Sequence, residues 1–459
     1  MNKSRIVHAN LMVAATALAL SGCGTGSMLF QKPAPPVGAQ AQGEMQGGQQ
    51  PIAGATMQLY AVGASGYGSA ATPLFTSTVT TNSNGAFSFP SGYCSNAPST
   101  SSLVYLVGTG GQPAGAGASV TNANEALMVA LGPCNSLTPS THIRINELTT
   151  VAAVWALAPF MSGTTTAYLN IGSTSTNATG IALAFDAAEQ VVNTSTGVIG
   201  GASLPAGATL PTDELNTLAD ILGQCVNSGG GTEGDSSNCG NLFVDAPNTA
   251  GTGYATDTIT AAMNIAENPA RNVTTLFDLV PPKPVFESTL SSAPNAWTVA
   301  IQYTGGGLNT PTAIAADQSG NIWVANSGLT GGSYYVSKFD NLGNAKTQTL
   351  VGGNPASGLA IDLSGNAWIA VGGVNALYEI DTTGALSAPK TGNGLNGPSG
   401  LAIDGNGAIW VINQSGNSVS AWDNTGNAIS GSPFSGAGIS SPVAIAINGN
   451  ANANCSDCH

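Results

Sequence analysis

The residues best suited to chemistry close the sequence, where Cys455, Ser456, Asp457, Cys458 and His459 follow one another. This is the C-x-x-C-H pattern of covalent c-type haem, in which two thiols bind the porphyrin and the histidine ligates iron. The pattern stands where the sequence departs from its repeat, with no domain beyond it to bury a porphyrin. We therefore expect no cofactor, and covalent haem c through Cys455, Cys458 and His459 is the alternative.

Three aspartates form a second set of candidate residues. Asp317, Asp362 and Asp404 lie 45 and 42 residues apart, and each is followed by glycine after three residues and by tryptophan after six. The pattern favours hairpin turns in which the carboxylate accepts backbone N–H bonds and glycine takes a positive φ. Calcium binding is the alternative, but these loops lack the further carboxylates that such a cation requires, so we expect no metal site. The tryptophans, which we expect to pack between repeats, are Trp323, Trp368 and Trp410.

The period of these residues indicates the architecture that positions them. Repeats of this length, with short apolar strands and a recurring aromatic residue, are typical of β-propeller blades. A fourth unit begins at Asn448, but Asn454 stands in the tryptophan position. A closed propeller has about four to eight blades. We therefore expect residues 296–459 to be an incomplete propeller, read from a truncated or frameshifted copy of a longer protein; completion by a second chain is the alternative.

The repeated positions resemble NHL-type repeats and the related streptogramin-lyase-like propellers over residues 296–450. This resemblance implies, as an alternative function, a lyase or lactonase that opens a lactone with a histidine base and Mg²⁺. The histidines are His8, His142 and His459, and none lies within the three units. The catalytic residues of that family therefore have no counterpart here, and we predict no catalytic residue.

The N-terminus has the order of a lipoprotein leader. Lys3 and Arg5 precede a short apolar run, residues 11–20. The leader closes with Leu20, Ser21, Gly22 and Cys23. The run is too short to span a bilayer and favours a cleaved signal peptide over residues 1–22. The four residues that end the leader resemble the bacterial lipobox, and this resemblance implies that Cys23 carries a lipid. Because Gly24 follows Cys23, the resemblance also implies that the protein is anchored to the outer membrane, where it faces the periplasm or the exterior. Residues 23–50, rich in Pro, Gly and Gln, are expected to be a flexible tether.

Export determines how the remaining cysteines are interpreted. Cys94, Cys134, Cys225 and Cys239 have no adjacent histidine or basic residue that would make a thiol reactive. In an oxidising compartment we expect the disulfides Cys94–Cys134 and Cys225–Cys239. Spacing alone does not prove this pairing.

Composition limits the class of partner. The net charge is −14, with 9 Lys and Arg against 23 Asp and Glu, and no basic cluster. Phosphate neutralisation requires Lys and Arg on one face, so we expect no nucleic-acid partner. The 42% of hydrophobic residues supports buried cores rather than disorder.

Two further domains are expected before the repeats. The alternating segment 56–62 and the continuous apolar segment 103–107, which is typical of a buried strand, predict a β-sandwich over residues 51–121. It resembles transthyretin-like, carboxypeptidase-regulatory modules through Pro51–Ala55 and Asn84–Phe87, and such modules act as spacers or adhesion units. Residues 122–280 have helical periodicity and predict an α-helical bundle, with Asn146 capping its first helix. Its expected helices cover residues 148–160, 181–192, 211–222, 258–266 and 273–279. A Pro-rich linker, residues 281–295, leads into the propeller.

Together these features predict a multidomain, mainly β protein: an N-terminal β-sandwich, a central α-helical bundle and a C-terminal incomplete β-propeller. We expect an exported protein that is anchored to the membrane by its N-terminal lipid. Its propeller would bind or scaffold a surface ligand or protein without catalysis.

Overall fold

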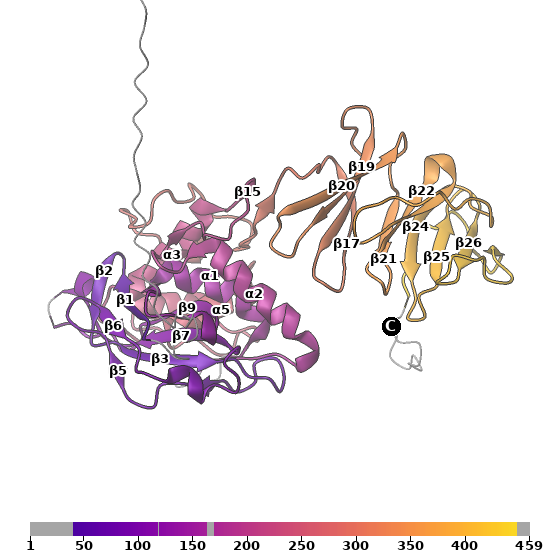
Figure 1. The fold of residues 1–459 in the computed structure, drawn as a ribbon. Helices are drawn as coiled ribbons and strands as arrows, with labels where there is room; N and C mark the ends of the chain where they lie inside the picture. The colour runs from indigo at the N-terminus through magenta and orange to yellow at the C-terminus, as the bar shows by residue number, and fades with distance from the viewer. Residues whose placement is uncertain (1–39, 118, 163–168, 448–459) are drawn as a thin grey trace, which may run out of the picture. The chain divides into compact units, whose positions relative to one another are not determined.

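The computed structural model describes residues 40–117, 119–162 and 169–447. This part of the chain is mainly β, with a group of helices in its first portion (Figure 1). No helix in it is both long and apolar enough to cross a bilayer. The expected signal peptide, the expected lipid attachment site Cys23 and the C-x-x-C-H motif of Cys455, Cys458 and His459 lie outside the described residues.

Two sheets enclose the first apolar core. The first has the order β10-β1-β2-β8 with β6 beside β1, and the second has the order β4-β3-β7-β9 with β5 beside β3. Met45, Leu59, Leu106 and Leu127 from both sheets are fully buried in one cluster. The strands are β1 (Gln42–Gly47), β2 (Gln50–Ala53), β3 (Thr56–Ala61), β4 (Thr72–Pro73), β5 (Val79–Thr80), β6 (Ala86–Ser88), β7 (Leu103–Thr109), β8 (Gln112–Pro113), β9 (Ala126–Pro133) and β10 (His142–Ile145).

Helices cover the other face of the second sheet. Met128 and Ala130 of β9 are buried with helix residues such as Val151, whereas Leu127 and Val129 face the core between the sheets. Because both faces of β9 are covered, its sequence is an almost continuous apolar run, as in strands buried on both sides. The helices are α1 (Glu147–Leu157), α2 (Ala178–Val191), α3 (Thr212–Val226), α4 (Asn238–Asp245), α5 (Thr258–Glu267) and α6 (Val273–Phe277).

Helix α1 is capped by Asn146, as the sequence predicts. The Asn146 side chain accepts a hydrogen bond from the backbone N–H of Thr149 at 2.9 Å, and Thr149 Oγ1 accepts one from the Asn146 backbone at 3.0 Å. This reciprocal capping satisfies two N–H groups that have no partner within the helix.

Three features differ from the sequence expectations. Strand β1 lies inside residues 23–50, which were expected to be a flexible tether, and it pairs in parallel with β10 and antiparallel with β6. Strands β9 and β10 lie inside residues 122–280, which were expected to be helical. Helix α4 was not predicted. Strands β1 and β10 are fixed by pairing between residues about a hundred positions apart in sequence, and β9 is fixed by its pairing with β7. Local periodicity does not report such pairing.

Short ribbons complete the first portion of the chain. They are two-stranded sheets formed by β11 (Met161–Ser162) with β12 (Asn170–Ile171), β13 (Val192–Asn193) with β14 (Val198–Ile199), and β15 (Ala208–Thr209) with β16 (Gln302–Tyr303).

The repeat units form successive antiparallel sheets, one for each unit (Figure 1). Within the described residues these sheets do not close into a ring. The first contains β17 (Pro311–Ala316), β18 (Ile322–Asn326), β19 (Tyr334–Phe339) and β20 (Ala345–Gly352). The second contains β21 (Gly358–Ile361), β22 (Ala367–Val371) and β23 (Ala376–Ile380), and the third contains β24 (Pro398–Ile403), β25 (Ile409–Asn413), β26 (Ser418–Trp422) and β27 (Phe434–Ser435).

Neighbouring sheets pack through the tryptophan of one unit and the first strand of the next. Trp323 is fully buried in a cluster with Leu359 of β21, and Trp368 is buried in a second cluster with Leu401 of β24. Trp410 of the third sheet is only half-buried and stacks on Phe434 of its own sheet at 5.7 Å between ring centroids.

A hydrogen bond from a hydroxyl group to a backbone carbonyl recurs at each contact between units. Thr312 Oγ1 donates to the Ala356 carbonyl at 3.5 Å, and Ser357 Oγ donates to the Pro398 carbonyl at 2.6 Å. Ser399 Oγ donates in the same way to the Pro442 carbonyl at 3.3 Å. Pro442 therefore lies against the third sheet in the place that Ala356 and Pro398 take against the sheets before them.

Candidate functional site

The repeated aspartates build the hairpin between the first two strands of each sheet. Oδ1 of Asp317 accepts hydrogen bonds from the backbone N–H groups of Ser319 and Asn321 at 3.0 and 2.9 Å. Asp362 and Asp404 make the same pair of bonds to the residues two and four positions later, at 2.8 to 2.9 Å. The glycine at the third position has φ between 78° and 84° in the three turns, a conformation that glycine adopts without strain.

The second oxygen of each aspartate binds the repeated tryptophan. The indole Nε1–H of Trp323 donates to Asp317 Oδ2 at 3.2 Å. The corresponding distances are 3.0 Å for Trp368 to Asp362 and 3.1 Å for Trp410 to Asp404. The sequence analysis assigned the aspartate to the turn and the tryptophan to packing, and it missed the bond between them. The constant separation of six residues was the available signal.

A second aspartate turn occurs in each unit and was also missed. Asp340, Asp381 and Asp423 follow the third strand, and Oδ1 of each accepts N–H bonds from the residues two and four positions later, at 2.8 to 3.0 Å. Each is followed by glycine after three residues, as the first aspartate is. Each unit therefore uses the same Asp-x-x-Gly turn twice.

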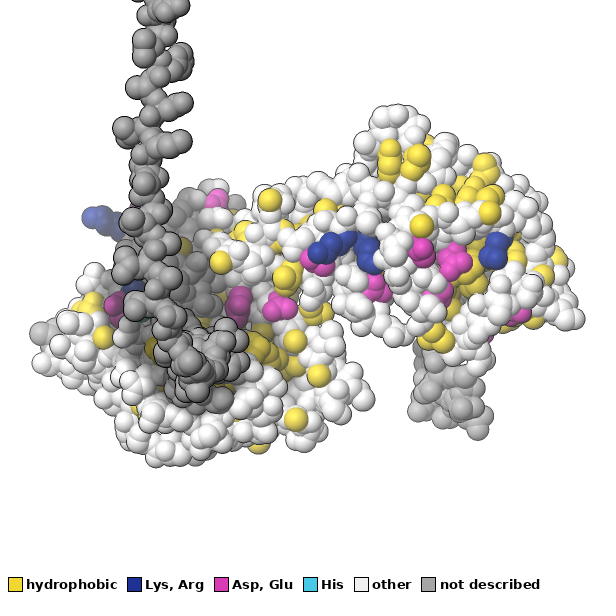
Figure 2. Space-filling model, viewed as in Figure 1, with side chains coloured by type: hydrophobic (Ala, Val, Ile, Leu, Met, Phe, Trp, Pro, Cys, Tyr) yellow, Lys and Arg dark blue, Asp and Glu magenta, His cyan; other side chains and the backbone are white. Residues whose placement is uncertain are grey.

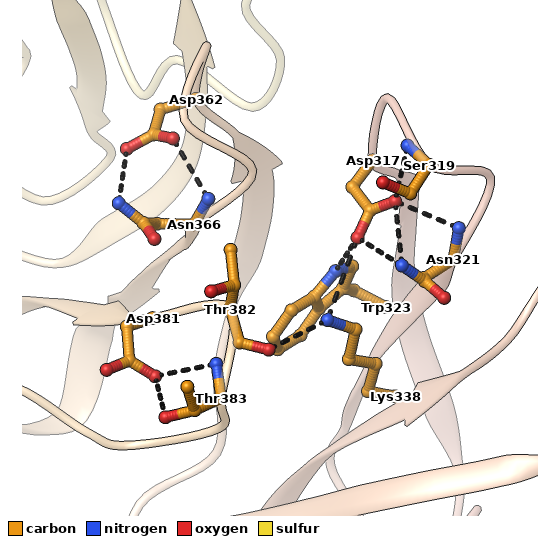
Figure 3. A network of polar contacts seen from close by, with 10 residues as sticks. All are labelled: Asp317, Ser319, Asn321, Trp323, Lys338, Asp362, Asn366, Asp381, Thr382 and Thr383. Atoms are coloured by element: carbon orange, nitrogen blue, oxygen red, sulfur yellow. Dashed lines mark hydrogen bonds and ion pairs between the residues drawn. The ribbon is translucent and has the colours of Figure 1, made fainter.

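Lys338 connects the first turn to the second sheet (Figure 3). Its ammonium group lies 3.7 Å from Asp317 Oδ2 and 4.4 Å from the centre of the Trp323 ring. It also donates to the backbone carbonyl of Thr382, in the second turn of the next unit, at 3.0 Å. The side chain is almost completely buried, so these three contacts compensate the removal of its charge from water.

The hydrogen bonds decide the charge state of these aspartates. Burial favours the neutral acid, but bonds from Asn321, Trp323 and the backbone outweigh it, and the pKa of Asp317 is lowered. At Asp404 burial is likewise outweighed, by the bonds from Trp410 and the backbone, and the pKa is lowered. Both carboxylates are therefore ionised near neutral pH and occupied by donors within their own unit.

The described residues contain no group of three or more His, Cys, Asp or Glu that is placed to hold a metal ion. His142 lies in β10, in the first sheet of the N-terminal portion, where it is paired with Gln42. Figure 2 shows few charged side chains among many uncharged ones, in keeping with a chain in which only 7% of residues are charged. The repeats thus bring the predicted aspartates and tryptophans together in pairs, and each pair connects a turn to a strand.

The expected disulfides, Cys94–Cys134 and Cys225–Cys239, are present. The first joins two segments that flank the strands of the second sheet, 40 residues apart in sequence. The second joins α3 to α4. Both pairs are buried.

No protein-family model matches the chain, and no curated protein matches it. Solved structures match a part of it. A catalytically inactive virginiamycin B lyase from Staphylococcus aureus, with quinupristin, is 20% identical over 28% of this chain and 42% of its own, with a TM-score of 0.25. A streptogramin B lyase is 17% identical over 28% of this chain and 43% of its own, with a TM-score of 0.24.

A protein of unknown function from Desulfotomaculum acetoxidans is 16% identical over 33% of this chain and 48% of its own, with a TM-score of 0.26. The chain therefore spans less than half the length of each of these three proteins.

Proposed function

We propose that this chain is an exported, lipid-anchored scaffold protein of the bacterial outer membrane, whose repeat sheets bind other copies of the chain. The leader pattern that ends at Cys23 supports export and lipid attachment. Two buried disulfides suit an oxidising compartment. The two N-terminal sheets would act as a spacer between the lipid and the repeats, which is the role that their resemblance to transthyretin-like modules implies.

The observation that carries the binding role is the exposure of Ile314. This residue precedes its aspartate by three positions, as Leu359 and Leu401 do in the next two units. Leu359 and Leu401 are 9% and 8% exposed because each packs against the tryptophan-bearing sheet before it. Ile314 is 70% exposed. The first sheet therefore presents to solvent the face that the second and third sheets bury.

The last described segment presents a matching surface. Val443, in the segment that Ser399 holds against the third sheet, is 73% exposed. Val443 and Ile314 are the two most exposed large hydrophobic side chains among the described residues. Covering such a side chain with another protein surface removes apolar area from water, which favours association.

The occupant that fits both surfaces is a second copy of this chain. Within the chain, the first strand of each unit contacts the first strand of the next, as Thr312 does with Ala356 and Ser357 with Pro398. Pro442 takes the corresponding place against Ser399, so contact between a Val443 surface and an Ile314 surface would join first-strand segments in the same order. A contact between two different surfaces of identical chains is heterologous, and it forms rings or open arrays. Head-to-tail association would thus arrange copies of the chain in a ring or in an extended scaffold.

Sedimentation velocity over a range of concentrations tests this proposal, with Cys23→Ser used to obtain the chain without lipid. We expect association that Ile314→Lys and Val443→Lys each weaken, because a buried lysine would lose its hydration. Val198→Lys, at a 55% exposed position in β14, is the matched control and should associate as the parent does. A chain that stays monomeric throughout, or that associates equally in all variants, would contradict the proposal.

A further inference from the structure

The second and third repeat sheets lie very close together at their first strands. Ser357, just before β21, donates to the carbonyl of Pro398 in β24 at 2.6 Å. A Cβ atom added to Gly358 of β21 would lie 2.8 Å from the Cα atom of Gly400 in β24, which is closer than such atoms pack. Glycine at this position therefore allows the two backbones to approach each other.

Larger side chains fill the space between sheets at the second strands. Trp368 of β22 is buried in a cluster with Leu401 of β24. Trp323 of β18 is buried in the same way with Leu359 of β21. An indole ring is one of the largest side chains, so the sheets stand farther apart here than at the first strands, where glycine meets glycine.

Farther out still, a turn makes the contact between the first and second sheets. In the turn after β23, the Thr382 carbonyl accepts from Lys338 of β19 at 3.0 Å, and the Gly384 carbonyl accepts from Thr349 of β20 at 2.8 Å. The turn thus fills the space between the outer strands. Successive sheets therefore diverge from their first strands, as blades do around the axis of a propeller.

The number of sheets decides how such a fan can close. A closed ring of blades contains about four to eight sheets. The repeats within the described residues supply three sheets and do not close by themselves. Two copies of the chain supply six sheets, twice three, which lies within this range. Three copies supply nine, which lies outside it, so closure selects two chains.

The two exposed faces point in the directions that closure requires. Ile314 takes the repeat position of Leu359, which packs against the sheet before its own. Val443 takes the repeat position of Ser357 and Ser399, whose hydroxyl groups donate to the unit that follows. Ile314 therefore faces backward along the order of the units, and Val443 faces forward.

A ring of two chains leaves neither of these apolar faces in water. An open row of chains keeps one Ile314 face and one Val443 face exposed at its ends, however long it grows. In a ring of two, the first contact holds the second pair of faces near each other, so the second contact forms at a high effective concentration. Burial of both pairs removes more apolar area from water per chain than a short row does.

We propose that two copies of this chain close into one ring of six sheets, in which the Ile314 face of each copy covers the Val443 face of the other. Such a ring depends on the head-to-tail binding proposed above, and it adds the number of chains. Its two contacts are identical and are related by a twofold axis, so association stops at two chains.

Cysteines on both faces of one chain test the ring. The chain carries Ile314→Cys and Val443→Cys together, with Cys23, Cys455 and Cys458 replaced by serine, and is oxidised mildly at several concentrations. We expect one covalent product of twice the mass of the chain, closed by two new disulfides and without a free thiol. Denaturing electrophoresis without reductant and mass spectrometry with thiol labelling measure both.

The matched control carries Val198→Cys in place of Ile314→Cys, at a position that is 55% exposed. It should not give the closed two-chain product. In sedimentation equilibrium, the chain with Cys23→Ser as its single change should reach twice its own mass and stay there as the concentration rises.

The outcomes separate the ring from the binding on which it depends. A ladder of trimers and longer products that grows with concentration would overturn the two-chain ring and leave head-to-tail binding standing. A chain that stays monomeric in both experiments would overturn the ring together with the binding. A two-chain product that the control forms equally well would overturn the assignment of the two faces.

Discussion

At the scale of single residues, one carboxylate does two tasks in each repeat unit. One oxygen of Asp317, Asp362 or Asp404 fixes the turn, and the other holds the indole of the tryptophan six residues later. The turn and the contact between sheets therefore depend on the same side chain. This is consistent with the recurrence of aspartate and tryptophan together at these three turns.

Trp368→Phe tests the coupling. It keeps an aromatic ring between the second and third sheets but removes the N–H that donates to Asp362 at 3.0 Å. Loss of one hydrogen bond to a charged, partly buried group should lower the free energy of unfolding by about 1–3 kcal/mol. Trp410→Phe, at the half-buried position, should cost less. Urea unfolding followed by circular dichroism measures both, and equal midpoints for the two variants and the parent would contradict the coupling.

Buried glutamates in the N-terminal portion give a pH dependence of known sign. Burial, opposed in part by hydrogen bonds such as that from Gly48, raises the pKa of Glu147 to about 8. Because the folded state holds this proton more tightly than the unfolded state, stability is full below the ordinary pKa of a glutamate. It falls as pH rises toward about 8, and levels off above it.

Glu147→Gln should therefore flatten this dependence. The variant should unfold at a higher temperature than the parent at mildly alkaline pH, and the difference should shrink near pH 4. Thermal unfolding across a pH series measures it, with Glu233→Gln as the control. A constant difference at every pH would show that Glu147 stays in one protonation state.

At the scale of elements, helix α4 is a short helix that a disulfide helps to stabilise. The sequence did not predict this helix, although it did predict the disulfide of its cysteine. Cys239 in α4 is bonded to Cys225 in α3, and Ser237 caps the helix by accepting the Gly240 N–H at 2.9 Å. A helix of this length has little stability alone, so the disulfide and the packing on α3 define it.

Removal of each disulfide should destabilise the chain, and the loss should rise with the logarithm of the length of the loop that the disulfide closes. The chain-entropy relation gives roughly 4 kcal/mol for the pair Cys94→Ala with Cys134→Ala and roughly 3 kcal/mol for Cys225→Ala with Cys239→Ala. Denaturant unfolding of both double variants measures the two losses. A larger loss for the Cys225–Cys239 pair, which closes the shorter loop, would be the contrary result.

At the scale of the whole molecule, local signals predicted the elements better than their grouping. Periodicity located the repeat sheets and most helices, and Asn146 marked the start of α1. The sequence could not show that one face of β9 packs in the core between the two sheets and the other face packs against the helices. These contacts join β9 to elements that lie far from it in the chain. The polar strand β1 has no apolar alternation to reveal it, and its pairing with β10, β6 and β2 defines it.

In the candidate site, too, local features could be predicted from the sequence, whereas contacts that depend on the folded structure could not. The aspartates and tryptophans recur in sequence, so their turns could be predicted, whereas the bond between them needed the geometry of a hairpin. The exposure of Ile314 could not be predicted at all. Its two counterparts are buried, and only the packing of one sheet on another distinguishes them.

Disulfide trapping between two chains tests the central claim most directly. One chain carries Ile314→Cys and the other Val443→Cys, both with Cys23, Cys455 and Cys458 replaced by serine, and the two are mixed under mild oxidation. Head-to-tail binding predicts a covalent dimer that forms far faster than with Val198→Cys in place of Ile314→Cys. No dimer, or one formed equally well with the control, would contradict the account.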